Sequence, residues 1–449
     1  MEPVSSLRIG SVSMTTLNNL PDELLAKILS FLPTKKAAST SIIAKRWRTL
    51  FALRRNLDFD DSNILDPVMA KEDSYRAWFR SFVDRTLALQ GGVHINKFTL
   101  QCVLEHDKIH VDRWINKSLQ RGVSELHLRL KDDKWLRLPS SLFVSRTLVK
   151  LTLGEELSIQ YLPSNTFLPL LKILFLRSVW FENQTFFDLL LGGCPALDEL
   201  TIHDEDFSGT PEAISSKTIT RLSILSKCAN DVDFSSFMSL DTPNLVTFFY
   251  VDFARERYLI RCNLDSLVKA VLDLHFLDPE DCDEPFEPNV TELMNGIHNV
   301  KILQLTQSAT EVIWKCCKGG LPIFKNLLHL EFLGYEESVW KELLPLMLEH
   351  SPNLERLFLS GLCRCKYEHE SDEIRIPETN KVSFLRITFY LGTEDELKHI
   401  SHFLIKMECL QVVQVYFAKT LVDESKKMQL TEDLLKLPKA SSNLIMHVI

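Results

Sequence analysis

Residues 354–359 are Leu354-Glu355-Arg356-Leu357-Phe358-Leu359, with leucines at the spacing L-x-x-L-x-L. The same spacing, with Ile, Val, Phe or Tyr at some apolar positions, recurs from residues 148, 171, 197, 219, 245, 300, 327, 382 and 410. Adjacent copies start 22 to 28 residues apart, except across the longer interval from 245 to 300. Each unit of this length supplies one short strand and one return segment, and covers its apolar face only by stacking on its neighbours. The spacing therefore predicts an α/β solenoid.

Leucine accounts for 74 of the 449 residues, and the repeat explains this excess. Alternate side chains of a strand point to the same side, so the spaced leucines form the inner layer. Period and core pattern together are the signature of leucine-rich repeats, and the return segments at 184–193 and 340–350 have helical patterns. Leucine-rich helices at heptad spacing, the alternative, explain neither the period nor the Pro-x-Leu sequences at 195–197, 243–245 and 352–354.

The residues between the inward leucines face the concave surface of the predicted solenoid. Three phenylalanines among them would form an apolar anchor set of the kind that recognises protein partners. We therefore expect this surface to bind a target protein through Phe175, Arg177, Phe249, Arg356 and Phe358. In the alternative, which the sequence leaves open, neighbouring segments cover these side chains.

Residues 17–33 predict a short amphipathic helix. Its apolar side chains recur at helical spacing, and Pro33 ends it. A second helical stretch follows and contains Trp47. Two or three short helices in about 40 residues are near the lower limit for a self-sufficient core. We expect such a module to bury part of its apolar stripe against a partner or the next domain, although any one of these residues could instead belong to an internal core.

This segment resembles the plant-type F-box over residues 17–62. The matching stretches are Leu20-Pro21-Asp22-Glu23-Leu24, Ile28-Leu29-Ser30-Phe31-Leu32-Pro33-Thr34, Lys45-Arg46-Trp47-Arg48 and Leu57-Asp58-Phe59-Asp60-Asp61-Ser62. Ala44 and Phe51 depart from it, because Ser and Trp are usual there. The resemblance implies docking on a Skp-family adaptor, which connects an F-box to a cullin and so to a ubiquitin ligase. The adaptor-binding set that it implies is Leu20, Pro21, Leu24, Ile28, Leu32 and Trp47.

Residues 363–449 resemble the plant FBD domain, which accompanies F-boxes and leucine-rich repeats. A helix is expected over 393–407, opened by the capping-box pair Thr393 and Glu396, then a strand over 410–417, a second helix and a last short strand. The matching residues are Gly392, Glu396, Leu397, Phe403-Leu404, Leu434-Leu435, Leu437-Pro438 and Ala440-Ser441-Ser442, while Lys439 and Leu444 depart from the pattern. Such a segment can cap the open apolar edge of the last repeat.

Charge and hydropathy narrow the classes of partner. The chain has 51 Lys and Arg against 60 Asp and Glu, a net charge of −9, and no dense basic run, which argues against nucleic-acid binding. No apolar run approaches the ~20 residues of a spanning helix, so no membrane partner is expected.

Residues 1–16 have the pattern of a disordered leader and not of a secretory signal, and the ten cysteines are scattered, so a cytoplasmic or nuclear location is expected. The acidic run at 278–292 is interpreted as a solvated loop.

Enzymatic motifs are missing from the sequence. It contains no phosphate-binding loop, dinucleotide fingerprint, nucleophile elbow or H-E-x-x-H motif. Cys363, Cys365 and His369, or His399 and His402, could suggest zinc, but four well-spaced ligands are lacking. No metal, cofactor or catalytic residue is predicted.

These patterns combine into one organisation, a short all-helical F-box followed by a leucine-rich-repeat horseshoe with a C-terminal FBD cap. The expected segments are a leader at 1–16, the F-box at 17–62, a helical and strand connection at 63–122, repeats at 123–362 and the FBD domain at 363–449. The family resemblance implies a non-catalytic substrate-recognition subunit of an SCF-type ubiquitin ligase that binds an unknown target protein. A ligase-independent leucine-rich-repeat scaffold is the alternative.

Overall fold

The computed structural model describes residues 20–41, 45–62, 73–103, 108–130, 138–159, 161–181, 183–204, 211–226, 239–254, 262–276, 288–317, 320–334, 340–362, 374–420, 423–441 and 443–449. The chain divides into two compact units, Met1–Lys131 and Asp132–Ile449. The expected leader at 1–16, the ligand candidates Cys363, Cys365 and His369, and most of the acidic run lie outside the described residues.

The first unit begins with three short helices, α1 (Asp22–Ser30), α2 (Thr34–Thr40) and α3 (Lys45–Ala52). Pro21 and Pro33 stand immediately before α1 and α2, where proline's fixed φ and missing N–H cost a helix little. Pro33 also disfavours helical backbone at the residue before it, which ends α1 as the sequence predicted.

A small parallel sheet completes the first unit. Its elements are β1 (Asn56–Asp60), α4 (Asp73–Leu89), β2 (Lys97–Cys102), α5 (Lys108–Gln120) and β3 (Glu125–Leu130). β2 pairs in parallel with both β1 and β3, and the three strands alternate buried and half-buried residues. Strand stacking of the repeat type thus begins at Asn56, so the segment at 17–62 that resembles an F-box is not all-helical as predicted, because its end pairs with β2.

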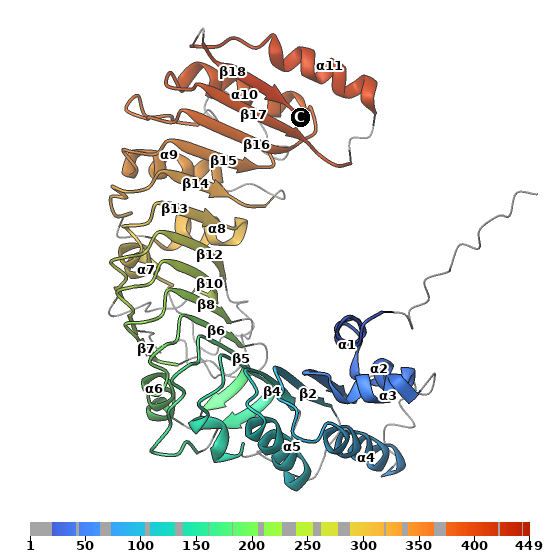
Figure 1. Ribbon diagram of the computed structural model, residues 1–449. Helices are drawn as coiled ribbons and strands as arrows, with labels where there is room; N and C mark the ends of the chain where they lie inside the picture. The colour runs from blue at the N-terminus through green and yellow to red at the C-terminus, as the bar shows by residue number, and fades with distance from the viewer. Residues whose placement is uncertain are drawn as a thin grey trace, which may run out of the picture. The chain divides into compact units, whose positions relative to one another are not determined.

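The second unit is built on a long series of parallel strands. They are, in spatial order, β4 (Lys150–Ile159), β5 (Ile173–Phe181), β6 (Glu199–Asp204), β8 (Arg221–Ser226), β10 (Thr247–Phe253), β12 (Lys269–His275), β13 (Ile302–Leu305), β14 (His329–Phe332), β15 (Arg356–Ser360), β16 (Phe384–Tyr390), β17 (Val412–Phe417) and β18 (Ile445–Val448). Figure 1 shows these strands lying side by side. β7 (Ala213–Ser215), β9 (Ser239–Asp241) and β11 (Cys262–Asn263) form a second, three-stranded sheet.

Return segments of the second unit contain the helices. They are η3 (Ser140–Val144), α6 (Gln184–Gly192), α7 (Thr291–Gly296), α8 (Gln307–Cys316), α9 (Trp340–His350), α10 (Glu394–Lys406) and α11 (Glu424–Leu435). The helices expected at 184–193 and 340–350 are confirmed as α6 and α9. α10 begins with the predicted capping box, in which Thr393 Oγ1 accepts from Glu396 N and the Glu396 carboxylate accepts from Thr393 N.

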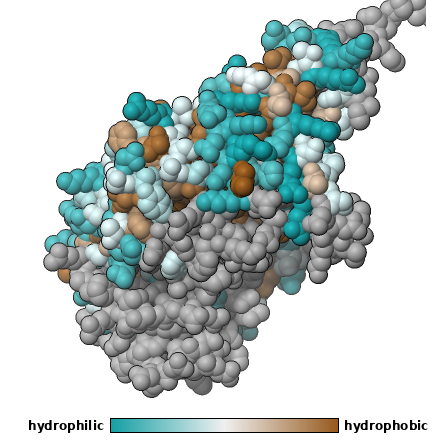
Figure 2. All heavy atoms as spheres, turned by 90° about the horizontal axis from the view of Figure 1, so that it is seen from below, coloured by the Kyte–Doolittle hydropathy of each residue, from teal (hydrophilic) through white to brown (hydrophobic). Residues whose placement is uncertain are grey.

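The spaced leucines form a continuous core because the strands pair in register. Leu330, Leu357, Leu385 and Val413 are successive partners on β14 to β17, and all are buried. On the face that Figure 2 shows, hydrophilic side chains predominate among the described residues, and hydrophobic ones lie scattered between them. No helix in the described ranges is long and apolar enough to span a bilayer. The strand order is consistent with the predicted solenoid.

Candidate functional site

The first candidate surface lies on α1 and the turn after it. Leu24, Ile28 and Phe31 have 49%, 39% and 77% of their surface exposed, while Leu25 and Leu29 are buried. Residues four apart lie above one another on a helix, so α1 presents one apolar line outward and another inward. We call Leu24, Ile28 and Phe31 the F-box apolar face.

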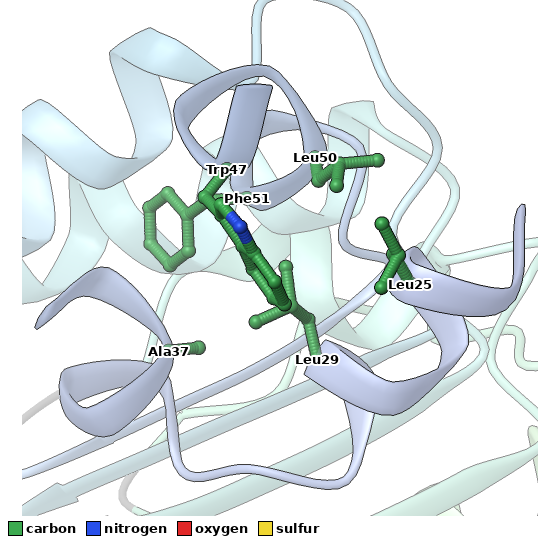
Figure 3. Packing of buried hydrophobic residues seen from close by; sticks show 6 residues of the cluster. All are labelled: Leu25, Leu29, Ala37, Trp47, Leu50 and Phe51. Carbon is green, nitrogen blue, oxygen red and sulfur yellow. The ribbon is translucent and has the colours of Figure 1, made fainter. Parts of the chain in front are cut away.

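A complete small core lies beneath this face. Its buried members are Leu25, Leu29, Ala37, Trp47, Leu50 and Phe51, and Leu20, Ala26, Leu32 and Ala38 pack against them. Figure 3 shows the buried side chains gathered between the three helices, with Trp47 extending toward Leu29. Phe51, which departs from the usual Trp, fills its place in this core. The outward apolar residues are therefore additional to what the module needs for its own folding.

The structure divides the predicted adaptor-binding residues into two groups. Pro21, Leu24 and Ile28 are exposed, and Leu20 and Leu32 are half-buried. Trp47 is only 7% exposed and belongs to the core, which differs from the adaptor-facing position that the family resemblance implied. The indole buries more apolar surface than any other side chain there, which favours the interior.

Phe31 was missed by the sequence-based choice of adaptor-binding residues, although it belongs to the apolar stripe. It directly follows the last residue of α1, where its backbone N–H still bonds to Ile28 O. Its position beyond the helix leaves the ring largely in solvent. The signal that could have identified it was a large aromatic residue at the end of an amphipathic helix, directly before a Leu-Pro pair.

Polar contacts fix the start of α1. Arg46, on α3, donates from Nε and Nη2 to Asp22 Oδ1 at 2.8 and 2.6 Å, and from Nη2 to Leu20 O at 2.7 Å. Asp22 lies in the first turn of α1, where a carboxylate also suits the helix dipole. The Lys-Arg-Trp motif thus supplies both a core residue, Trp47, and a brace for α1.

A second set of polar contacts joins α2 to strand β1. Asp58 Oδ1 accepts from the backbone N and the Oγ1 of the wholly buried Thr34, at 2.9 and 2.8 Å, and Asp58 N donates to Thr34 Oγ1 at 2.8 Å. Asp58 therefore satisfies a donor at the N-terminus of α2 that has no partner within the helix. The motif residues Leu57 and Phe59 point the other way, into the core.

A buried arginine ties the same region to α4. Arg54 Nη2 donates to Leu32 O at 2.7 Å, and Gln90 Nε2 donates to Arg54 O at 2.9 Å. Burial lowers the pKa of Arg54, and the nearby Asp58 carboxylate opposes this shift. These contacts hold the end of α1 in place.

The second candidate surface is the open face of the repeat sheet. Following the strand pairing residue by residue, Phe175, Phe249 and Phe358 fall on one row across β5 to β15. Three strand steps separate the first two and four separate the last two, or about 14 and 19 Å at ~4.8 Å per step. The structure places the three rings on one face, as predicted, without bringing them together.

The exposure of these rings differs from the prediction. Phe175 and Phe249 are half-buried, and Arg177 is half-buried one row away. Phe358 is only 7% exposed, because the Arg386 guanidinium and the His329 ring lie 4.4 and 4.1 Å from its ring centroid. The prediction of an exposed anchor at Phe358 is therefore wrong. Its ring packs beneath the Arg386 guanidinium instead.

Arg356 and Arg386 gather around aromatic rings on β15 to β17. Arg356 Cζ lies 4.8 Å from the Phe384 centroid, and Arg386 Cζ lies 5.7 Å from that of Tyr416. Arg386 donates from Nε and Nη2 to Gln414 Oε1 at 3.2 and 3.0 Å. Both guanidinium planes are thus oriented by neighbours on adjacent strands.

His402 and His399, considered for zinc, are used in packing. His402 Nε2 lies 2.8 Å from Ile374 O, and the His399 ring contacts that of Trp340. Within the described ranges no group of three or more His, Cys, Asp or Glu side chains could hold a metal ion.

Two family models match the chain. An F-box domain matches residues 17–58, and the model "FBD-associated F-box protein At5g56370, LRR repeats" matches residues 111–314. Among curated proteins, the putative F-box/LRR-repeat protein At3g44810 of Arabidopsis thaliana is 59% identical, across 98% of this chain and all of that protein. The putative F-box/LRR-repeat protein At3g42770 and the putative F-box protein At3g44060, from the same plant, are 49% and 46% identical, each across 96% of this chain and 80% and 99% of those proteins.

Proposed function

The chain belongs to the plant F-box/LRR-repeat protein family, and from this membership we propose that it is the substrate-recognition subunit of an SCF-type ubiquitin ligase. In this role the F-box docks a Skp-family adaptor, and through it a cullin, while the repeats bind the target protein. The F-box apolar face carries the proposal: Leu24, Ile28 and Phe31 are exposed over a core that is complete without them.

The mechanism that we propose requires no catalytic group in this chain. Holding the target near a ubiquitin-loaded enzyme converts an encounter in solution into one within a complex, which raises the effective concentration of the reacting lysine. The hydrogen bonds between α2 and β1, through Thr34 and Asp58, attach the F-box to the sheet of its own unit and are consistent with such a role. We place this activity in the cytoplasm or nucleus, as the cysteine pattern of the sequence suggested.

The C-terminal segment has a proposed structural part in this function. β16, β17 and β18 extend the parallel pairing of the repeats, and α11 buries Leu430 and Leu434. We propose that these elements, in the segment that resembles an FBD domain, close the horseshoe of repeats and shield the apolar edge of the last one.

Adaptor capture by single variants of the full chain tests the docking proposal. Leu24→Ala and Phe31→Ala should each weaken capture of a Skp-type adaptor by about 1–3 kcal/mol, because each side chain would be buried on binding. Ile109→Ala is the matched control, since Ile109 is as exposed as Phe31, at 77%, and lies on α5. Capture that is unchanged in both F-box variants would refute the docking surface.

Ubiquitin transfer separates this function from a ligase-independent scaffold. Proteins captured by the repeats should receive ubiquitin only when adaptor, cullin and this chain are all present. The Phe31→Ala variant should retain those proteins and lose the transfer. Equal transfer with and without the adaptor would favour the scaffold.

A further inference from the structure

Five residues on neighbouring strands form what we call the arginine–aromatic patch: Arg356, Phe358, Phe384, Arg386 and Tyr416. Their strands are paired so that Arg356 stands beside Phe384 and Phe358 stands beside Arg386. Cation and ring therefore alternate in both directions on the open face. The residues that alternate with them along the strands, Leu357, Leu359, Leu385, Ile387 and Val415, are buried in the core.

The arginines of the patch are held by rings and an amide. Within the described part of the chain, the contacts of Arg356 and Arg386 are with aromatic rings and the Gln414 amide and include no ion pair, in a protein whose net charge is −9. By contrast Arg221, on β8 of the same face, pairs with Asp198 and Glu199 at 2.7 and 3.2 Å. The patch thus has two arginines that form no ion pair within the described residues, with Glu331 on the adjacent strand as the nearby carboxylate.

Both signs of charge are present beside the patch. Lys269 and His329 lie on the same row as Arg356. Burial lowers the pKa of His329, the Glu331 carboxylate opposes this shift, and Arg356, Arg386 and Lys269 add to it. Glu331, which accepts a hydrogen bond from Gln304, is thus one carboxylate among three cations that act on His329.

Stacked guanidinium groups are suited to carboxylates. A ring over a guanidinium leaves edge N–H donors for the planar fork that a carboxylate accepts. The Nε–Nη2 edge of Arg386 already donates to Gln414 Oε1, so on this arginine the Nη1 side is the edge for a carboxylate. Arg356 and Arg386 lie on adjacent strands, two positions apart, so their Cα atoms are about 8 Å apart. Alternate residues of an extended peptide, which point to the same side, are about 7 Å apart.

We propose that the arginine–aromatic patch binds an extended acidic segment of the target protein, with one carboxylate on each arginine and the intervening residue over the rings. This inference rests on the proposed function and specifies its target class: proteins that expose two acidic residues separated by one other. The half-buried Phe384 and Tyr416 rings contribute apolar contact area beneath the segment, while the buried Phe358 ring packs against Arg386.

Peptide binding to the full chain tests the inference. The probe is a labelled octapeptide of alternating Glu and Thr, compared with the same peptide containing Gln in place of Glu, and with single-stranded oligothymidine. The Glu peptide should bind and the Gln peptide should not. Arg356→Gln and Arg386→Gln should each weaken binding at least about tenfold, and Arg386→Lys should restore only part of it. Arg221→Gln is the matched control and should leave binding unchanged.

Several results would overturn the inference: no saturable binding up to about 1 mM peptide, equal binding of the Gln peptide, or no effect of either Gln substitution at the patch. Tighter binding of oligothymidine that competes with the peptide would make the patch a nucleic-acid site instead. Arg356 is exposed, so its loss should not disturb folding even if Arg386→Gln does. Adaptor capture is measured on the same preparations: if capture persists without peptide binding, only the inference fails, and if the unmodified chain captures no adaptor, the proposed function fails.

Discussion

Replacing Asp58 by alanine should loosen the F-box without touching its apolar face. Asp58 Oδ1 accepts two hydrogen bonds from Thr34, one from the first backbone N–H of α2 and one from Oγ1. Thr34 is wholly buried, so water cannot readily replace the lost acceptor. In the alanine variant, both donors would remain buried without this partner.

The size of the effect follows from these two bonds. A hydrogen bond to a charged group contributes about 1.5–3 kcal/mol, and the backbone bond at a helix N-terminus alone about 1 kcal/mol. The Asp58 side chain is itself partly exposed, which reduces both values. We expect Asp58→Ala to lower the local stability of the F-box by about 3 kcal/mol. Asp58→Asn, which keeps an acceptor oxygen, should lower it by about 1 kcal/mol.

Hydrogen exchange measures this locally in the full chain, where a single global unfolding energy would not be defined. Amides of α2 and α3 should exchange roughly a hundredfold faster in Asp58→Ala, because each 1.4 kcal/mol is a factor of ten. Asp58→Asn should accelerate them by less than about tenfold. Amides of β16 and β17, in the other unit, serve as the internal reference and should be unaffected.

Unchanged exchange in Asp58→Ala would show that the tether to β1 does not stabilise the F-box. Equal acceleration in the alanine and asparagine variants would show that charge, and not the acceptor geometry, is what matters. Either outcome would refute the magnitude given above.

Three further changes have definite expected results. Gly392→Ala should destabilise the C-terminal segment by about 2 kcal/mol, measured by hydrogen exchange of the α10 and α11 amides, because Gly392 has φ +80° and the added Cβ would overlap Leu430 Cδ2. Asp273→Asn should lower the stability of the region around β12 by about 1 kcal/mol at pH 5, because it removes the hydrogen bond between Asp273 and His275. That hydrogen bond is the main cause that lowers the pKa of Asp273 to about 2, and it also raises the pKa of His275. That cost should shrink as pH falls from about 4 toward 2, and also as pH rises through the raised pKa of His275. Trp47→Ala should lose adaptor capture together with exchange protection of the F-box, whereas a variant of the exposed face should lose capture alone.

The repeat spacing predicted most of the fold because a strand has a side-chain period of two. Once Leu357 and Leu359 are assigned to the core, Arg356 and Phe358 must face the other side, and the structure places them there. The capping box of α10 was predictable for a similar reason, since both its residues lie within four positions of each other.

Exposure could not be predicted in the same way, because it depends on residues distant in sequence. Phe358 is covered by Arg386, 28 positions later, and only strand register brings the two together. Trp47 enters the F-box core because α1 and α2 leave room for a large ring beside Leu29. Sequence patterns identify the face on which a residue lies, and they do not show what lies over it.

The two proposed surfaces rely on different physics, and this has a consequence for a ligase subunit. The F-box apolar face would bind by removing hydrocarbon from water, an effect that salt does not screen. The arginine–aromatic patch would bind through charges at the surface of the sheet, which are screened over about 8 Å at physiological ionic strength. On these proposals target binding should weaken as the salt concentration rises, while adaptor binding should change little. Adaptor capture and peptide binding measured across one salt series would separate the two surfaces.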